Sequence, residues 1–257
     1  LPLLSVPGTE NAIDFLGAWY ASATARQLIQ RFPEIQNTLK SIQIQGKSSE
    51  SLISQLEKNQ DLKLMVIEST PWLTEANDET MQQRQLLRLF DEQQQLINEE
   101  AMLQKLSNLQ LPSGAFSWMD GMPANRYITQ LIADKMLRLY NQQNDDRKPG
   151  LRRMIVRAFT YLDSQLANDL AHLKQNDKKY ASRKTITTLQ LYYLTMRAVW
   201  SDTPENEATR EAISYYSNQI TSYRHSFSIY EKALAVQFFH RSGKTVYATE
   251  LLKSLRE

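Results

Sequence analysis

The amino-acid sequence predicts an all-α fold, and three observations support this prediction. Only 7 Gly and 8 Pro occur in 257 residues, and most of them lie between segments with helical periodicity. An all-β or α/β fold would need many more turn residues than this chain contains. Apolar residues recur at spacings of three and four along most of the chain, which is the pattern of amphipathic helices. We therefore expect about eleven or twelve helices that are joined by short turns and stacked as hairpins.

The first predicted helix covers 10–32, with Thr9 as its N-cap. Its apolar residues spread over a wide arc, which indicates burial on more than one side. A second helix is expected in 33–42. The apolar run within 62–73 is ambiguous between strand and helix, and the lack of a partner strand favours a helix. A longer helical segment follows at 77–109.

A central loop of about a dozen residues begins the stretch 111–140, leads into a long amphipathic helix, and separates the helices before it from the rest of the chain. The residues that prevent a regular helix there are Pro112, Gly114, Gly121 and Pro123. The same loop carries the large apolar residues Phe116, Trp118 and Met119. Because such side chains favour burial, we expect the loop to be held against the core.

After the loop, helical stripes of apolar residues recur to the end of the chain. They lie in 128–139, 151–170, 186–200 and 213–220, and a final helix pair is expected at 226–240 and 245–255. Pro204 is predicted in the first turn of its helix, and Gly243 as the C′ residue between the last two. The polar stretch 141–150 is the only one that resembles a boundary, and it is too short to predict two domains. We expect a single domain over 1–257.

Composition excludes several classes of function. Lys+Arg 30 against Asp+Glu 28 gives a net charge of +2, and no basic stripe indicates a nucleic-acid partner. Cysteine is absent, so the chain has no disulfide, no thiolate metal site and no cysteine nucleophile. No apolar run approaches the roughly 20 residues that cross a bilayer, so we expect no membrane insertion by this segment. Residues 1–8 lack the basic region of a signal peptide, and we expect the chain to be part of a much larger multidomain protein.

Few residues indicate catalysis or metal binding. His172, His225 and His240 are far apart and none has a second ligand at i+3 or i+4, so no metal site is expected. The sequence contains neither a glycine-rich phosphate loop nor a nucleophile elbow, and we expect no cofactor. Asp120 could serve as a glycosidase acid, but that reaction needs a positioned pair of carboxylates. A solvated turn residue is the favoured interpretation of Asp120.

Four residues in and after the central loop form a candidate interaction surface: Trp118, Asp120, Arg126 and Tyr127. An aromatic and cationic patch of this kind can recognise a partner, and the same residues can instead anchor a loop to its helix. Anchoring is the favoured interpretation from the residues alone.

Three stretches resemble the thioester-containing domain of alpha-2-macroglobulin-like proteins, most of all in the bacterial branch. SGAFSWMDGMPANRYITQ at 113–130 is similar to the segment after the mid-domain turn of that family, and PWLTEANDETMQQRQLLRLFD at 71–91 to a connecting segment. The stretch 222–257 is similar to the late hairpin with its terminal Ser-Leu-Arg-Glu. Together they span nearly the whole chain. The resemblance implies an α/α toroid, with helical hairpins in two layers, whereas periodicity alone is equally compatible with an open solenoid.

In that family a Cys-x-Glu-Gln motif precedes the first helix, and its Cys and Gln side chains form an internal thioester. The matching stretch here, VPGTENAIDF, puts Gly8 at the cysteine position, Glu10 at the glutamate and Asn11 at the glutamine. Without a thiol no thioester can form. Some members also use a histidine shortly after the Gly-x-Phe segment, and 114–127 contains none.

The resemblance therefore implies a non-enzymatic domain of a periplasmic or cell-envelope protein, with a lipid-anchored parent. It would interact non-covalently with other domains of the parent or with a protease, in protease inhibition or defence of the envelope. Two alternatives from other classes are a glycosidase-like or other enzyme on the same toroid, and a helical scaffold for a peptide partner. The enzyme needs a second carboxylate near Asp120, and the scaffold needs a concave groove lined by Tyr and Trp.

Overall fold

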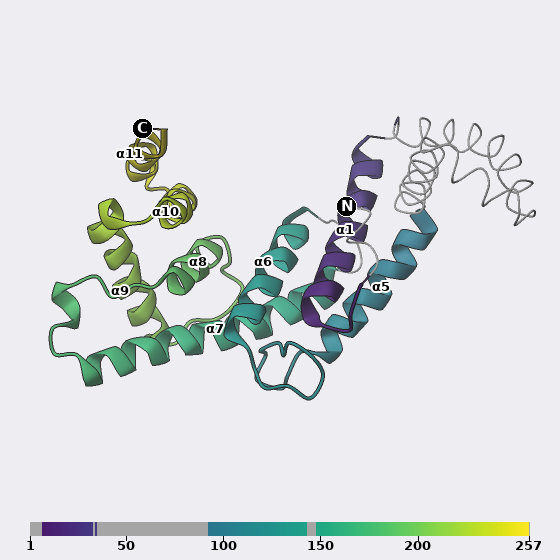
Figure 1. Cartoon of the computed structure of the whole chain (residues 1–257), viewed down its shortest axis with the longest axis horizontal. Helices are drawn as coiled ribbons and strands as arrows, with labels where there is room; N and C mark the ends of the chain where they lie inside the picture. The colour runs from purple at the N-terminus through teal and green to yellow at the C-terminus, as the bar shows by residue number, and fades with distance from the viewer. Residues whose placement is uncertain (1–6, 33, 35–91, 143–147, 257) are drawn as a thin grey trace, which may run out of the picture. The chain divides into compact units, whose positions relative to one another are not determined.

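The computed structural model describes residues 7–32, 34, 92–142 and 148–256 (Figure 1). These residues form eight α-helices and no β-strand, which confirms the all-α prediction for the described part of the chain. The chain divides into two compact units, Leu1–Asn108 and Leu109–Glu257. The division falls just before the central loop and not at the polar stretch 141–150. The single domain expected from the sequence stays a prediction.

The described part of the first unit is a helix pair. Helices α1 (Ala12–Arg31) and α5 (Glu92–Asn108) pack against each other, drawn in purple and blue in Figure 1. Buried side chains lie all around α1, as the wide apolar arc predicted. They include Phe15, Leu16, Ala18, Trp19, Ala21, Ala25 and Ile29. The helices expected at 33–42 and 62–73, and the start of the one at 77–109, lie outside the described residues.

One ion pair is buried between these two helices. Arg26 Nε and Nη2 donate to the two carboxylate oxygens of Glu99 at 3.0 and 3.3 Å, and both side chains are at most 5% exposed. A two-pronged guanidinium–carboxylate pair is geometrically specific, and loss of one partner would leave a buried charge. The pair therefore selects one register of α1 on α5.

The described part of the second unit contains six α-helices. They are α6 (Arg126–Gln142), α7 (Lys148–Asn176), α8 (Thr188–Arg197), α9 (Glu207–Tyr223), α10 (Ile229–Arg241) and α11 (Thr245–Arg256). Consecutive helices pack as α6 on α7 and α10 on α11, and α7 also contacts α9 while α8 contacts α10 (Figure 1). This packing agrees with the stacked hairpins expected from the short connections.

The apolar stripes predicted in this unit are largely the observed core. On α7 the whole stripe is at most 2% exposed: Leu151, Ile155, Ala158, Leu162, Leu166 and Leu170. Gly243 has a φ of +74° and ends α10 as predicted, because Gly243 N and Lys244 N donate to the carbonyls of His240 and Phe239.

Two predicted helix starts in this unit are wrong. Pro204 lies before α9 and not in its first turn, because the Asn206 side chain accepts from Thr209 N and so caps the helix. Helix α10 begins at Ile229 and not near Ser226, which belongs to a separate 3-10 turn, Arg224–Ser226. Both differences follow from capping side chains that satisfy the first free amides of a helix.

None of the helices in the described ranges combines the length and the apolar character that a membrane-crossing helix needs.

Candidate functional site

The central loop is held to α7 by polar contacts at its base. Gln110 Nε2 donates to the carbonyls of Gly114 and Met154 at 3.1 and 2.9 Å, and Arg157 Nη2 donates to Leu111 O at 2.7 Å. Isolated backbone bridges pair 110 with 116 and 117 with 124. The loop is therefore a folded structure with a defined base.

Gly114 and Phe116 explain how the base reaches the core. Gly114 has a φ of +91°, and a Cβ at this position would lie 2.1 Å from Arg157 O. Only glycine combines that φ with so close an approach. Phe116 is fully buried, as predicted, and its N–H donates to Thr129 Oγ1 at 2.8 Å.

Beyond the base the loop carries exposed apolar side chains. Trp118 is 38% exposed and Met122 44%, while Met119 is half-buried. The predicted burial of Trp118 is wrong, because the bridge between 117 and 124 carries the intervening turn out of the core. Tyr127, in the first turn of α6, is 57% exposed. The aromatic half of the candidate interaction surface is thus accessible.

Asp120 occupies the turn itself. It is exposed, and its Oδ1 accepts from Gly121 N at 3.0 Å, where Gly121 has a φ of +74°. A short side chain that binds the next backbone amide is typical of a turn residue. This geometry agrees with a solvated turn residue, the favoured interpretation from the sequence.

Arg126 is an anchor and not an exposed recognition residue. Its Nη1 lies 2.8 Å from Asp169 Oδ2 on α7, and its side chain is 19% exposed. Gln190 Nε2 on α8 donates to the same Asp169 oxygen at 2.7 Å and to the Tyr216 hydroxyl on α9 at 3.2 Å. Burial raises the pKa of Tyr216, so its hydroxyl stays protonated. Four helices meet in this network, at the point where the loop enters α6.

The positions that match the thioester motif form a helix cap. Asn11 Oδ1 accepts from Ile13 N and Asp14 N, both at 2.9 Å, and its Nδ2 donates to Thr9 Oγ1. Asn11 is therefore the N-cap of α1, and the prediction of Thr9 is wrong. Thr9 N and Oγ1 instead donate to Asp14 Oδ2 at 2.7 and 2.8 Å, and these bonds lower the pKa of Asp14. Asn11, only 7% exposed, uses both ends of its carboxamide inside this cap.

The other two motif positions have little role in the cap. Gly8 contributes no side chain, and a Cβ there would meet Asp14 Oδ2 at 3.5 Å, which is an ordinary contact distance. The carboxylate of Glu10 is 86% exposed and lies 3.4 Å from Lys105 Nζ on α5. An exposed pair of this kind contributes little to stability.

A buried polar cluster in the second unit has no signal in the sequence. Asp163 on α7 accepts from the Tyr193 hydroxyl at 2.5 Å and from Arg197 Nε at 3.2 Å, both on α8. Arg197 also contacts Glu205 in the segment that follows α8. Because these residues are 30 or more positions from Asp163 in the chain, no local pattern could have paired them.

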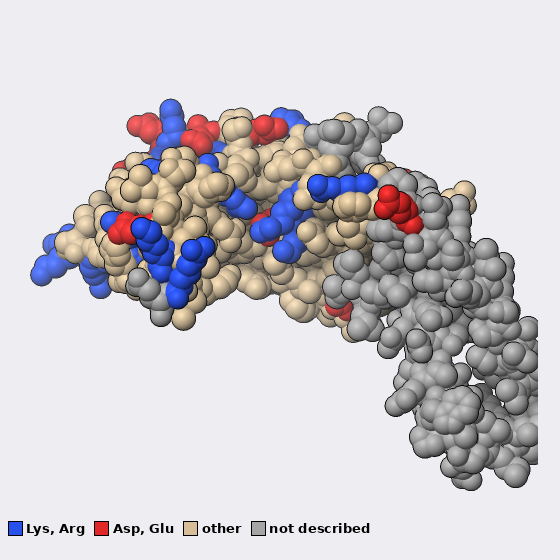
Figure 2. All heavy atoms as spheres, turned by 90° about the horizontal axis from the view of Figure 1, so that it is seen from above, with Lys and Arg blue, Asp and Glu red and all other residues tan. Residues whose placement is uncertain are grey.

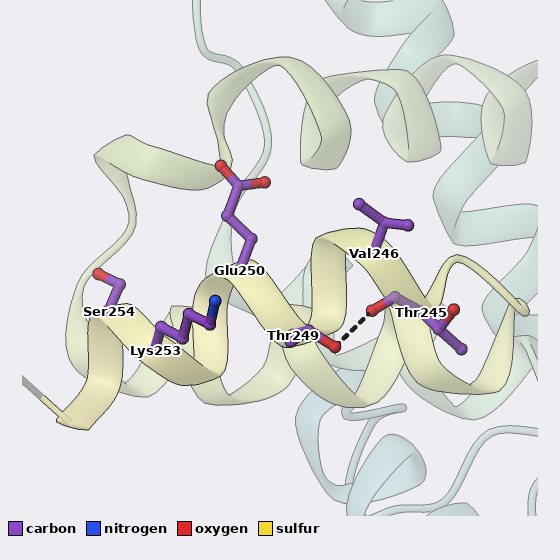
Figure 3. Close-up of a pocket in the computed structure, with 6 residues that line it drawn as sticks. All are labelled: Thr245, Val246, Thr249, Glu250, Lys253 and Ser254. Atoms are coloured by element: carbon purple, nitrogen blue, oxygen red, sulfur yellow. Dashed lines mark hydrogen bonds between the residues drawn. The ribbon is translucent and has the colours of Figure 1, made fainter.

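The three histidines lie at the protein surface. His172, His225 and His240 are all exposed, and within the described ranges no three His, Asp or Glu side chains come together as metal ligands do. A hollow of about 630 Å³ lies along α11, and Figure 3 shows that one helix supplies all of its lining. The lining residues are Thr245, Val246, Thr249, Glu250, Lys253 and Ser254. On the face seen in Figure 2, Lys and Arg are interspersed with Asp and Glu, which suits a net charge of +2.

Comparisons with protein-family models, with curated proteins and with solved structures find no match to this chain. The resemblance to alpha-2-macroglobulin-like proteins therefore rests on the sequence motifs alone. The family, function and location that it implies are proposals.

Proposed function

We propose that this chain is a thioester-lacking helical domain of a bacterial alpha-2-macroglobulin-like protein that acts through non-covalent contacts. The observation that carries the proposal is the use of the motif positions at the start of α1. Gly8 offers no thiol, and the Asn11 carboxamide is bound at both ends within the cap. A thioester needs a thiol and an acyl donor held beside it. The stretch thus serves as a structural cap.

The exposed tip of the central loop and the first turn of α6 support a role in interaction. Trp118, Met122 and Tyr127 present apolar surface, while Gln110 and Arg157 hold the loop base to α7. Tryptophan and tyrosine are the residues that most often dominate binding energy at protein interfaces. A loop held in one conformation also loses less entropy on binding than a mobile loop. The partners in this proposal are other domains of the parent protein or a protease.

The larger arrangement belongs to the same proposal. The helices would form a two-layer α/α toroid, and the α6–α7 and α10–α11 pairs support the hairpins from which such a ring is built. The parent would be a periplasmic or cell-envelope protein with a lipid anchor, taking part in protease inhibition or defence of the envelope.

The two alternatives find less support. An enzyme would need Asp120 in a positioned carboxylate pair, but Asp120 is exposed and bound to its own turn. A peptide scaffold would need a concave groove lined by Tyr and Trp. The hollow on α11 is lined by neither.

The experiment uses the full-length parent protein and measures inhibition of casein hydrolysis by trypsin, chymotrypsin and elastase. Methylamine attacks an internal thioester. Because this chain lacks one, methylamine should change neither the intact mass of the protein nor the inhibition. Trp118→Ala combined with Tyr127→Ala should weaken inhibition by about tenfold, because two accessible aromatic anchors are lost.

The matched control is Tyr230→Ala, since Tyr230 on α10 is 60% exposed, close to the 57% of Tyr127. This variant should inhibit like the unmodified protein. A mass increase with methylamine would contradict the non-covalent role. Equal inhibition by the double variant and the control, or no inhibition by the parent, would contradict the proposed interaction.

A further inference from the structure

The segment 198–206, which connects α8 to α9, is held by one buried side chain. Arg197 donates from Nη1 to Trp200 O and from Nη2 to Thr203 O, the latter at 3.1 Å. Trp200 is 4% exposed and its Nε1 donates to Thr203 Oγ1 at 2.8 Å. The Trp200 ring also packs against Phe159 of α7, with ring centroids 5.6 Å apart. The segment is thus tied to Arg197, which in turn donates to Asp163.

Two carboxyl groups share the single guanidinium of Arg197. Asp163 Oδ1 lies 3.2 Å from Arg197 Nε, and Glu205 Oε1 lies 2.7 Å from Arg197 Nη2. The Asp163 and Arg197 side chains are each 5% exposed, and that of Glu205 is 34% exposed. With both carboxyls ionised the cluster would carry one net negative charge inside the protein. Burial strongly disfavours an uncompensated charge, so a neutral cluster with one added proton is the favoured state.

The position of that proton follows from the hydrogen bonds of Asp163. Its Oδ1 accepts from both the Tyr193 hydroxyl and Arg197 Nε, so both lone-pair directions of Oδ1 are used. Its Oδ2 is buried and has no hydrogen-bond partner among the described residues. Burial raises the pKa of Tyr193 well above its usual value, so the phenol is a donor and not a competing acid. The Glu205 side chain is 34% exposed, whereas that of Asp163 is 5% exposed.

We propose that the segment 198–206 is a proton-linked latch, which closes over Asp163 with one proton on Oδ2 and releases that proton to water when it opens. Opening would hydrate Asp163 and move the Glu205 charge away, and both changes favour the ionised carboxylate. Among the described residues, the charged or titratable groups that act on Asp163 are Tyr193 and Arg197 from α8 and Glu205 from the latch.

The sign of the pH dependence follows from this linkage. Burial raises the pKa of Asp163, and the Glu205 charge raises it further, against the lowering effects of Tyr193 and Arg197. The closed state therefore binds the proton more tightly than the open state. Closure is most favoured below the ordinary aspartate pKa of about 3.9, and it weakens as pH rises through the closed-state pKa. One proton changes the opening equilibrium by at most about tenfold per pH unit.

The experiment measures amide hydrogen exchange of residues 198–206 in the 257-residue chain from pH 4 to 9, expressed as protection factors. In the unmodified protein, protection should fall as pH rises, over the interval set by the Asp163 pKa. Asp163→Asn keeps a neutral group that accepts from Tyr193 and Arg197, so its protection should lack this step. Infrared difference spectra between the two proteins should show a protonated carboxyl band at low pH that disappears over the same interval.

A second variant, Glu205→Gln, tests the effect of the Glu205 charge in the same experiment. It removes the charge that favours the added proton, so both the exchange step and the infrared band should shift to lower pH. A step of equal size in Asp163→Asn, or no shift in Glu205→Gln, would overturn the proposal. If Asp163→Asn does not fold, the infrared band of the unmodified protein and its shift in Glu205→Gln still decide the outcome, and absence of the band overturns it.

Discussion

At Gly114 the backbone combines a φ of +91° with close contact to α7. Both features require the absence of a Cβ, because a Cβ would disfavour the left-handed φ and would block the approach to Arg157 O. The contact joins the base of the central loop to the helix that carries the longest buried stripe. A single glycine thus determines where the exposed tip, with Trp118 and Met122, lies relative to α7.

Gly114→Ala should lower the free energy of unfolding by roughly 3 kcal/mol. Alanine disfavours this φ, and its methyl group would clash with Arg157 O, which only a movement of the backbone can relieve. Gly121→Ala is the matched control. Gly121 has a φ of +74°, but an added methyl group there would meet nothing within 4 Å, so its loss should be roughly 1 kcal/mol. Urea denaturation of both variants measures the difference, and equal losses would contradict the close approach.

At the scale of the helix, capping side chains decide where α8 and α10 begin. Thr187 with Gln190 and Ser228 with Glu231 each form a reciprocal capping box. In the second box Glu231 also accepts from Thr188 Oγ1 at 2.9 Å and lies 3.5 Å from Lys184 Nζ. The start of α10 is therefore tied to the start of α8. Two helices separated by a third in the chain are aligned at their N-termini in this way.

The Glu231 carboxylate makes this junction sensitive to acid. Burial raises its pKa, but the hydrogen bonds from Ser228 and Thr188 and the charge of Lys184 together hold it below the usual value. A carboxyl whose pKa is lowered by folding stabilises the folded state at pH values above its unfolded-state pKa. That stability is lost as the pH falls through the folded-state pKa. The capping box should therefore weaken in acid.

Ser228→Ala should cost about 1 kcal/mol of unfolding free energy, because Glu231 N loses its acceptor. Ser201→Ala, at an exposed position outside the helices, serves as the control and should change stability by less than about 0.5 kcal/mol. Thermal or urea unfolding at neutral pH checks both values. A cost for Ser228→Ala no larger than that of the control would show that the cap does not stabilise α10.

At the scale of the whole molecule, the proposed toroid predicts a small radius of gyration. A compact chain of this length should have a radius of gyration of about 18 Å. A closed two-layer ring should lie near that value, whereas an open superhelix of the same helices would be clearly larger. Small-angle X-ray scattering of the 257-residue chain measures this radius. An elongated profile would contradict the toroid and favour the open solenoid.

The sequence by itself determined which segments of the described chain are helices and most of the apolar stripes that are buried in the second unit. The α7 stripe from Leu151 to Leu170, the burial of Phe116 and the C′ position of Gly243 were all predicted and are confirmed. These features depend on residues within one or two helical turns of each other. Local periodicity and the special conformations of glycine are therefore sufficient to reveal them.

Only the tertiary structure decided the features that join distant parts of the chain. Trp118 and Phe116 are two residues apart and both apolar, yet Trp118 is exposed and Phe116 is buried, because the loop base is held to α7 and the turn between 117 and 124 points out of the core. The pairing of Asp163 with Arg197 is likewise invisible in sequence, since charged residues at that separation have many alternative partners. Burial and hydrogen bonding across the chain depend on how helices pack, and periodicity within one helix carries no information about its neighbour.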